Sequence, residues 1–113
     1  MTCLFCNIIS GDIPADIVYE DDQLIAFRDI TPQAPNHILV IPRKHISTLN
    51  DATAGDAELL GHIMLSAAKL AAQLDCADEG YRVVMNCNAA AGQTVFHIHL
   101  HLLCGRNMHW PPG

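Results

Sequence analysis

The stretch His97-Ile98-His99-Leu100-His101-Leu102-Leu103 carries three histidines at alternate positions. Successive side chains of a β-strand point to opposite faces, so a strand here puts the three imidazoles on one face and the aliphatic residues on the other. Neighbours on one face lie about 6 to 7 Å apart, and we therefore expect the three rings to reach one phosphate-sized group or one metal ion. The stretch predicts a reactive surface on a strand whose back packs in a core.

Length and composition indicate one domain that covers residues 1–113. Half of the 113 residues are apolar and 16% are charged, which favours a packed core over disorder. The formal net charge is -6, and the six lysines and arginines form no run or stripe. This argues against binding to a nucleic-acid backbone, whereas a single nucleotide, whose few charges backbone N–H groups can hold, stays open.

The first residues do not have the pattern of a targeting segment. Met1-Thr2-Cys3-Leu4-Phe5-Cys6 lacks a basic stretch and a long apolar stretch, and His62, Ser66 and Lys69 interrupt the apolar residues of the helical region. We therefore expect a cytoplasmic protein with no membrane span. An odd number of cysteines without an export signal predicts reduced thiols, and the five are Cys3, Cys6, Cys76, Cys87 and Cys104.

Apolar spacing and turn residues predict an α+β fold. Residues 56–74 carry apolar side chains at helical spacing, and Thr53 with Asp56 resembles a capping box before them. A short helical segment is expected at 5–9, and strands are expected at 17–19, 24–28, 37–41, 80–86 and 95–103. This order favours a five-stranded antiparallel meander with the long helix on one face, in which the last two strands pair as a hairpin.

The histidines suit nucleophilic attack on phosphorus. Imidazole titrates near neutrality, so one histidine can be a neutral nucleophile while its neighbour donates a proton or a hydrogen bond. Attack gives a covalent phospho-imidazole, which water later hydrolyses. The alternative is a metal site, because zinc enzymes take two histidines from one strand at this spacing.

The segment before the histidines favours an anionic ligand. Asn86 supplies a polar side chain, and Ala89-Ala90-Ala91-Gly92-Gln93-Thr94 is a small-residue turn that lets backbone N–H groups approach a phosphate. A Gly-Gln-Thr sequence alone is more often a plain hairpin loop. The prediction of a phosphate site therefore depends on the histidines that follow.

The run from His97 to Leu103 matches the full signature of the histidine triad (HIT) family, which is His, apolar, His, apolar, His, apolar, apolar. Other segments resemble the Hint branch of that family, the histidine triad nucleotide-binding proteins, which are purine nucleoside phosphoramidases. These segments are 27–35, 39–42, 44–47, 91–95 and the closing 105–113, which ends Met-His-Trp-Pro-Pro-Gly. The resemblance covers nearly the whole chain.

This resemblance implies a fold, an assembly and an activity. The fold is HIT-like, with a five-stranded antiparallel meander, one long helix and a short N-terminal helix, and its sheet continues across a homodimer. The activity is hydrolysis of the P–N bond of an adenosine or guanosine phosphoramidate through a nucleotidyl-histidine. No cofactor is required for this catalysis.

The resemblance also implies a role for each matching residue. His99 is expected to be the nucleophile, His101 to contact the phosphate, and His97 with His37 to orient the nucleophile. Asp29 is expected to hold the ribose hydroxyls, because a carboxylate accepts two hydrogen bonds. Phe27 and Ile30 are expected to line the base pocket, and Asn86, Gly92, Gln93 and Thr94 the phosphate side. Relatives often carry serine at the position of Thr94, which keeps the hydroxyl near the leaving group and adds a methyl.

Cys3 and Cys6 form a single C-x-x-C, which is a weak zinc signal alone. Some members of the family bind structural zinc through such a pair together with the residues that match His45 and His97. Two cysteines and two histidines are a sound tetrahedral zinc set, but many relatives lack the cysteines. Structural zinc and plain reduced thiols both stay open.

Two other functions also stay open. The chain could be a nucleotide-binding interaction protein whose catalysis is incidental, or a hydrolase of dinucleoside polyphosphates. The Trp110-Pro111-Pro112-Gly113 ending argues against the second, and the resemblance places this tail near the partner subunit's pocket, where it affects the choice of leaving group.

Overall fold

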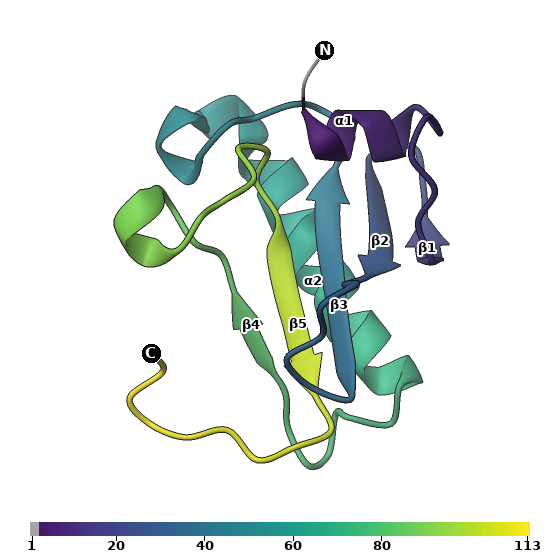
Figure 1. Cartoon of the computed structure of the whole chain (residues 1–113), viewed down its shortest axis with the longest axis vertical. Coiled ribbons are helices and arrows are strands. Elements are labelled where there is room, and N and C mark those ends of the chain that lie inside the picture. Colours follow the sequence, from purple (N-terminus) through teal and green to yellow (C-terminus); the bar gives the residue numbers. More distant parts are fainter. Residues whose placement is uncertain (1–2) are drawn as a thin grey trace.

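The computed structural model describes residues 3–113 and confirms an α+β fold (Figure 1). The helices are α1 (Leu4–Ile9) and α2 (Ala57–Gln73), whose ends agree with the expected ends within one residue. The strands are β1 (Ile17–Glu20), β2 (Leu24–Arg28), β3 (Asn36–Pro42), β4 (Arg82–Val84) and β5 (Leu100–Cys104). Short 3-10 turns lie at Leu49–Asp51, Ala54–Asp56 and Ala89–Ala91.

The five strands form one antiparallel sheet in the order β1-β2-β3-β5-β4. The expected hairpin of the last two strands is present, but the expected meander is wrong, because β5 lies between β3 and β4. Both β3 and β4 run antiparallel to β5 and are therefore parallel to each other. Parallel strands need a crossover connection, and α2 supplies it.

Helix α2 covers one face of the sheet, behind the strands in Figure 1. Its buried residues, among them Ile63 and Ala67, pack against alternate residues of the central strands such as Val40 and Leu102. The entry to the helix is fixed by Asp56, whose carboxylate accepts the Thr53 backbone N–H at 2.9 Å, as the capping-box pattern predicts. The other face of the sheet is not covered by α2.

Helix α1 packs on that other face, near the ends of the central strands. Its buried residues Phe5 and Ile8 contact a second apolar cluster that includes Phe27, Leu39 and Ile41. Across the sheet, Phe27 pairs with Leu39 and Leu39 pairs with His101. His101 of β5 therefore lies in one row with an apolar surface that α1 partly covers.

Strand β5 begins at Leu100, so the expected strand over 95–103 is too long and only His101 of the three histidines lies in a regular strand. The pairing of Val40 with Leu100, if continued, would place Ile98 opposite Pro42. Proline has no backbone N–H to donate to such a ladder. The N–H of Ile98 instead donates to the carbonyl of Ile46 at 2.8 Å.

Cys76 and Cys104 form a disulfide, so the expectation of five reduced cysteines is wrong for this pair. The turn after α2 brings Cys76 beside the end of β5, and the two Cα atoms lie 6.2 Å apart, within the range that a disulfide spans. Cys3, Cys6 and Cys87 are free thiols. Within residues 3–113, no helix is long and apolar enough to cross a membrane.

Candidate active site

A cleft of about 290 Å³ opens between α1, the end of β2 and the histidine segment. Its apolar wall comes from α1, the 13–15 segment and the sheet, and its polar end comes from Asp29, Thr94 and the histidines. The lining residues are Leu4, Phe5, Ile8, Ile13, Pro14, Ala15, Phe27, Arg28, Asp29, Ile30, Leu39, Thr94, Val95, His99 and His101. The cleft thus has an apolar part and a polar part.

His99 is buried and held in one tautomer. Its Nδ1 lies 2.9 Å from the backbone carbonyl of His97. A carbonyl oxygen only accepts hydrogen bonds, so the proton is on Nδ1 and the Nε2 of a neutral His99 carries a free lone pair. The ring of Phe5 packs edge-on against the imidazole, with centroids 5.0 Å apart. The geometry thus fixes the ring and leaves one nitrogen able to act as a nucleophile.

His101 is oriented by a chain of hydrogen bonds that starts in the loop before β3. The backbone N–H of Gln33 donates to Nδ1 of His37 at 3.0 Å, so the proton of a neutral His37 is on Nε2. That Nε2 donates to Nδ1 of His101 at 2.9 Å. The remaining proton of His101 is therefore on its Nε2. His37 contacts His101 rather than His99, which it was expected to orient.

Asp29 lies at the end of β2 beside these histidines. One carboxylate oxygen accepts the backbone N–H of Thr31 at 2.8 Å, and the other lies 3.5 Å from Nε2 of His37. Its own N–H donates to the carbonyl of His37 at 2.9 Å. Strand pairing and the turn therefore both fix this carboxylate at the edge of the cleft.

Burial favours the neutral form of the histidines. Desolvation lowers the pKa of His99, and the hydrogen bond to the His97 carbonyl and the charge of Asp29 only partly oppose this effect. Burial, with the charges of His99 and His37 nearby, lowers the pKa of His101 to about 4. Burial also lowers the pKa of His37. At neutral pH the site therefore presents uncharged imidazoles.

His97 does not face the cleft with the other two histidines, so the expectation that all three rings reach one group is wrong. Its imidazole is fully buried and its Nε2 donates to the carbonyl of Pro42 at 2.7 Å. Its Nδ1 turns toward the sulfur atoms of Cys3 and Cys6, at 3.5 and 3.6 Å, and lies 3.1 Å from Nδ1 of His45. The structure thus brings together the four residues expected to bind zinc.

The donor set fits a tetrahedral zinc ion. Zn–N and Zn–S bond lengths put the ligand atoms about 3.3 to 3.8 Å apart at the corners of a tetrahedron, and the contacts of His97 with its three neighbours are close to these values. A metal-binding histidine usually donates its other ring N–H to a carbonyl or carboxylate, and the hydrogen bond from His97 Nε2 to the Pro42 carbonyl leaves Nδ1 as the nitrogen that can bind the metal. Cys3 Sγ also accepts the N–H of Cys6 at the start of α1.

The residues expected on the phosphate side divide into two groups. Thr94 is exposed and lines the cleft. The described residues that line the cleft do not include Asn86, Gly92 or Gln93. Both ends of the buried Gln93 side chain are occupied, because its oxygen accepts the N–H of Asn88 and its amide donates to Ser47 and Val95 carbonyls. Gln93 therefore shapes the loop.

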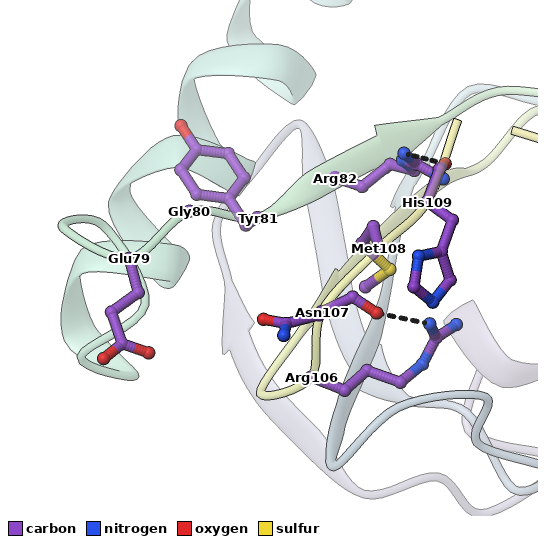
Figure 2. Close-up of a pocket in the computed structure, with 8 residues that line it drawn as sticks. All are labelled: Glu79, Gly80, Tyr81, Arg82, Arg106, Asn107, Met108 and His109. Atoms are coloured by element: carbon purple, nitrogen blue, oxygen red, sulfur yellow. Dashed lines mark hydrogen bonds between the residues drawn. The ribbon is translucent and has the colours of Figure 1, made fainter. Parts of the chain in front are cut away.

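A second pocket, of about 480 Å³, lies where the C-terminal tail passes β4 (Figure 2). Arg82 donates to the carbonyl of His109 at 2.8 Å, and Arg106 donates to that of Asn107 at 3.2 Å. Both arginines thus fix the course of the tail. Neither faces the cleft that contains His99.

Sequence reasoning missed two residues that shape the site. Phe5 contacts His99, and Gln33 sets the tautomer of His37. Gln33 acts through its backbone N–H, which every residue except proline has, so its side chain gives no signal. Phe5 lies between the two cysteines of the expected zinc set, and this place in the sequence is the signal that could have found it.

The fold and the paired histidines define a HIT-domain protein, and the chain belongs to the HIT domain family, which it matches over residues 10–108. It is 53% identical to the purine nucleoside phosphoramidase of Escherichia coli K12, over 91% of this chain and 87% of that protein. The crystal structure of a HIT family hydrolase from Legionella pneumophila matches with a TM-score of 0.98 and 56% identity, over 99% of this chain and 100% of the other. The histidine triad nucleotide-binding protein of Candida albicans matches with a TM-score of 0.83 and 33% identity, over 97% and 83%.

Proposed function

We propose that the protein is a hydrolase that cleaves the P–N bond of purine nucleoside phosphoramidates, with His99 as the nucleophile. The observation that carries the proposal is the hydrogen bond from His99 Nδ1 to the His97 carbonyl, since it leaves Nε2 unprotonated at the polar end of the cleft. The name of the Escherichia coli relative supports the same substrate class.

The division of the cleft fits a nucleotide. Apolar side chains line one part, where Phe27 is buried and Ile30 is 97% exposed. Covering such an exposed apolar side chain with a flat base removes apolar surface from water, which lowers the free energy of the complex. Asp29 lines the same cleft and its carboxylate lies 3.5 Å from His37, in a position suited to the two ribose hydroxyls. The phosphorus then lies near His99.

The proposed reaction has two steps. In the first, Nε2 of His99 forms a bond to phosphorus, the P–N bond breaks with its electron pair going to nitrogen, and the amine leaves with one proton from the solvated cleft. In the second, water attacks phosphorus, releases a proton, and frees His99 with the nucleoside monophosphate. His101 donates its Nε2–H to a phosphoryl oxygen, and the exposed Thr94 hydroxyl lies on the leaving-group side.

Structural zinc is part of the proposal. Cys3, Cys6, His45 and His97 would hold it. Because α1 and its N-cap residue Cys3 supply two of these ligands, and α1 also supplies Leu4, Phe5 and Ile8 of the cleft wall, bound zinc would tie the wall to the histidine segment. The zinc would take no part in the chemistry.

A homodimer is also proposed, with the sheet continued from one subunit to the other. Strand β4 is an outer strand, so the backbone groups on one of its sides have no partner strand within the described chain. Sedimentation analysis tests this expectation, and a species with the mass of a single chain at micromolar concentration would contradict it.

The experiment is amine release from an adenosine phosphoramidate, compared with a dinucleoside polyphosphate at the same concentration. The proposal predicts hydrolysis of the phosphoramidate with the higher kcat/KM, and loss of this activity in His99→Ala but not in His62→Ala, a histidine of α2 outside the cleft. Full activity in His99→Ala would refute the nucleophile. A protein that binds the nucleotide and releases no amine would favour the interaction-protein alternative.

A further inference from the structure

Arg106, just after β5, connects the C-terminal tail to the loop of residues 29–35. Its Nε donates to the backbone carbonyl of Gln33 at 2.8 Å, and its Nη1 donates to the carbonyl of Asn107 at 3.2 Å. Figure 2 shows the guanidinium turned toward Asn107, on the side of the pocket away from Glu79. A guanidinium is planar and holds its donors in a fixed geometry, so it fixes the two carbonyls relative to each other.

A neighbouring contact holds the same loop against the end of β5. Gly105 has φ +99, and a Cβ placed there would lie 2.9 Å from Cβ of Pro35. Only glycine combines this backbone conformation with so close an approach. Two adjacent residues after β5 therefore hold the loop: Gly105 packs against Pro35, and Arg106 donates one hydrogen bond to Gln33.

The residue that Arg106 holds also belongs to the hydrogen-bond chain of His37 and His101, through the peptide group on its other side. The carbonyl of Gln33 accepts from Arg106, and the N–H of Gln33 donates to Nδ1 of His37 at 3.0 Å. His37 in turn donates to His101 at 2.9 Å. A continuous path of three side chains and one residue's backbone thus leads from Arg106 to the phosphate-facing histidine.

We propose that Arg106 is a positioning residue for the reaction. It holds Gln33 so that its N–H stays on Nδ1 of His37, which keeps the proton of His37 on Nε2 and the free proton of His101 directed at the phosphate. The kinetic part of this inference rests on the proposed function, because it needs the phosphoramidate as substrate. The part that concerns the tautomer of His37 does not.

The proposal predicts a particular division between kcat and KM. Asp29 is fixed independently of Arg106, since its N–H donates to the carbonyl of His37 and its carboxylate accepts from Thr31. Ribose binding should therefore persist when Arg106 is changed. A misaligned His101 should lower the rate of the chemical step, so we expect kcat to fall about tenfold while KM changes by less than about threefold.

The variants are Arg106→Met, which keeps the aliphatic stem and removes all donors, and Arg106→Lys, which restores one charged donor. Arg82→Met is the matched control, because Arg82 also donates to a tail carbonyl but makes no hydrogen bond to the 29–35 loop. We expect kcat to be equal in wild type and Arg82→Met, lower in Arg106→Lys and lowest in Arg106→Met. Should Arg106→Met fail to fold, Arg106→Gln is the second loss variant, with the same expected fall in kcat.

The second readout is the histidine tautomer, measured by nitrogen NMR on the full chain labelled at its seven histidines. The signals of His37 are assigned by their loss in His37→Gln. In wild type and Arg82→Met we expect an unprotonated Nδ1 and a protonated Nε2, and in Arg106→Met we expect both signals to move toward the average of the two tautomers. A purely structural role would leave these shifts unchanged.

The outcomes are distinguishable. Unchanged His37 signals in the folded Arg106 loss variant, an unchanged kcat, or an equal loss in Arg82→Met would overturn the positioning role. Absence of phosphoramidate hydrolysis in the wild type would refute the proposed function, and the NMR comparison would then decide alone whether Arg106 sets the tautomer of His37.

Discussion

The backbone carbonyl of His97 accepts the Nδ1 proton of His99 at 2.9 Å, while the imidazole of His97 points away into the Cys/His cluster. One residue thus orients His99 with its backbone and contributes its side chain to the candidate metal site. The alternation of the histidines suggests a single reactive face, but the side chains go to two neighbouring sites. His99 and His101 line the cleft, and His97 belongs to the Cys/His cluster. This separation gives the first prediction.

Replacing the side chain of His97 should affect metal binding far more than chemistry. His97→Gln removes a ligand but keeps the carbonyl that orients His99. We expect bound zinc to be lost and kcat to fall less than about tenfold, against at least about 10³-fold for His99→Ala. Metal analysis and amine release measure both effects. Cys6→Ser, which also removes a ligand, is the control, and a kcat in His97→Gln as low as in His99→Ala would contradict the separation.

Zinc should stabilise the fold through the cluster on α1. At a free zinc concentration one hundred times Kd, binding to the native state alone adds about 2.7 kcal/mol to the free energy of unfolding. Thermal unfolding with and without a chelator should show this gain in wild type and lose it in Cys3→Ser. The half-buried Cys87, outside the cluster, supplies the control Cys87→Ser. Equal responses of Cys3→Ser and Cys87→Ser to the chelator would refute the site.

The pH–rate profile should lack an acid limb at the ordinary imidazole pKa of 6.5. Burial and the neighbouring histidines lower the pKa of His101 to about 4. Burial lowers the pKa of His99 as well, and a lowered histidine pKa means that the neutral form persists to lower pH, so kcat/KM should stay level as the pH falls through 6.5 and decline only below that value. Circular dichroism at each pH checks that the chain is folded. A fall centred near pH 6.5 would disprove neutral His101 as the working form.

Asp21 should contribute acid-sensitive stability by linking the turn after β1 to α2. Burial would raise its pKa, but hydrogen bonds from the backbone of Gln23 and Leu24 and from His62 and Tyr19 outweigh this effect and lower the pKa well below the ordinary range. The His62 contact is 2.7 Å long.

A carboxyl group with a lowered folded-state pKa stabilises the fold above its unfolded-state pKa, and this contribution is lost as the pH falls below about 4. Urea unfolding should therefore show Asp21→Asn less stable than wild type by about 1 kcal/mol at neutral pH, with the difference shrinking in acid. The exposed Asp22 provides the control Asp22→Asn. A difference that stays constant down to pH 2 would contradict the linkage.

Much of the fold follows from local sequence patterns. The spacing of apolar residues in α2 and the β-branched run of β3 each predict an element whose ends agree within about one residue, because both signals come from residues close together in the chain. The position of β5 between β3 and β4 was not predictable in this way. It depends on the crossover of α2, and local periodicity carries no information about strand order.

The candidate site shows the same limit. The motif identifies His99 and His101, and both line the cleft. The resemblance identifies the metal set, and the structure brings its four members together. The side chain of His97 points away from the cleft because its imidazole donates to the carbonyl of Pro42, where the strand pairing ends. This contact joins residues far apart in the chain, so it can be seen only once β3 and the histidine segment lie side by side. Contacts made by the backbone, such as that of the Gln33 N–H with His37, cannot be predicted from side-chain identity.

The central claim, that His99 Nε2 forms a covalent bond to phosphorus, is tested most directly by intact-mass measurement of the protein mixed with an adenosine phosphoramidate. The reaction is stopped in alkaline denaturant, because phospho-imidazole bonds are labile in acid, and the modified peptide is sequenced. We predict one adduct with the mass of an adenosine monophosphoryl group, on His99, and none in His99→Ala. An adduct on His101 or another residue, or amine release by His99→Ala at the wild-type rate, would contradict the account.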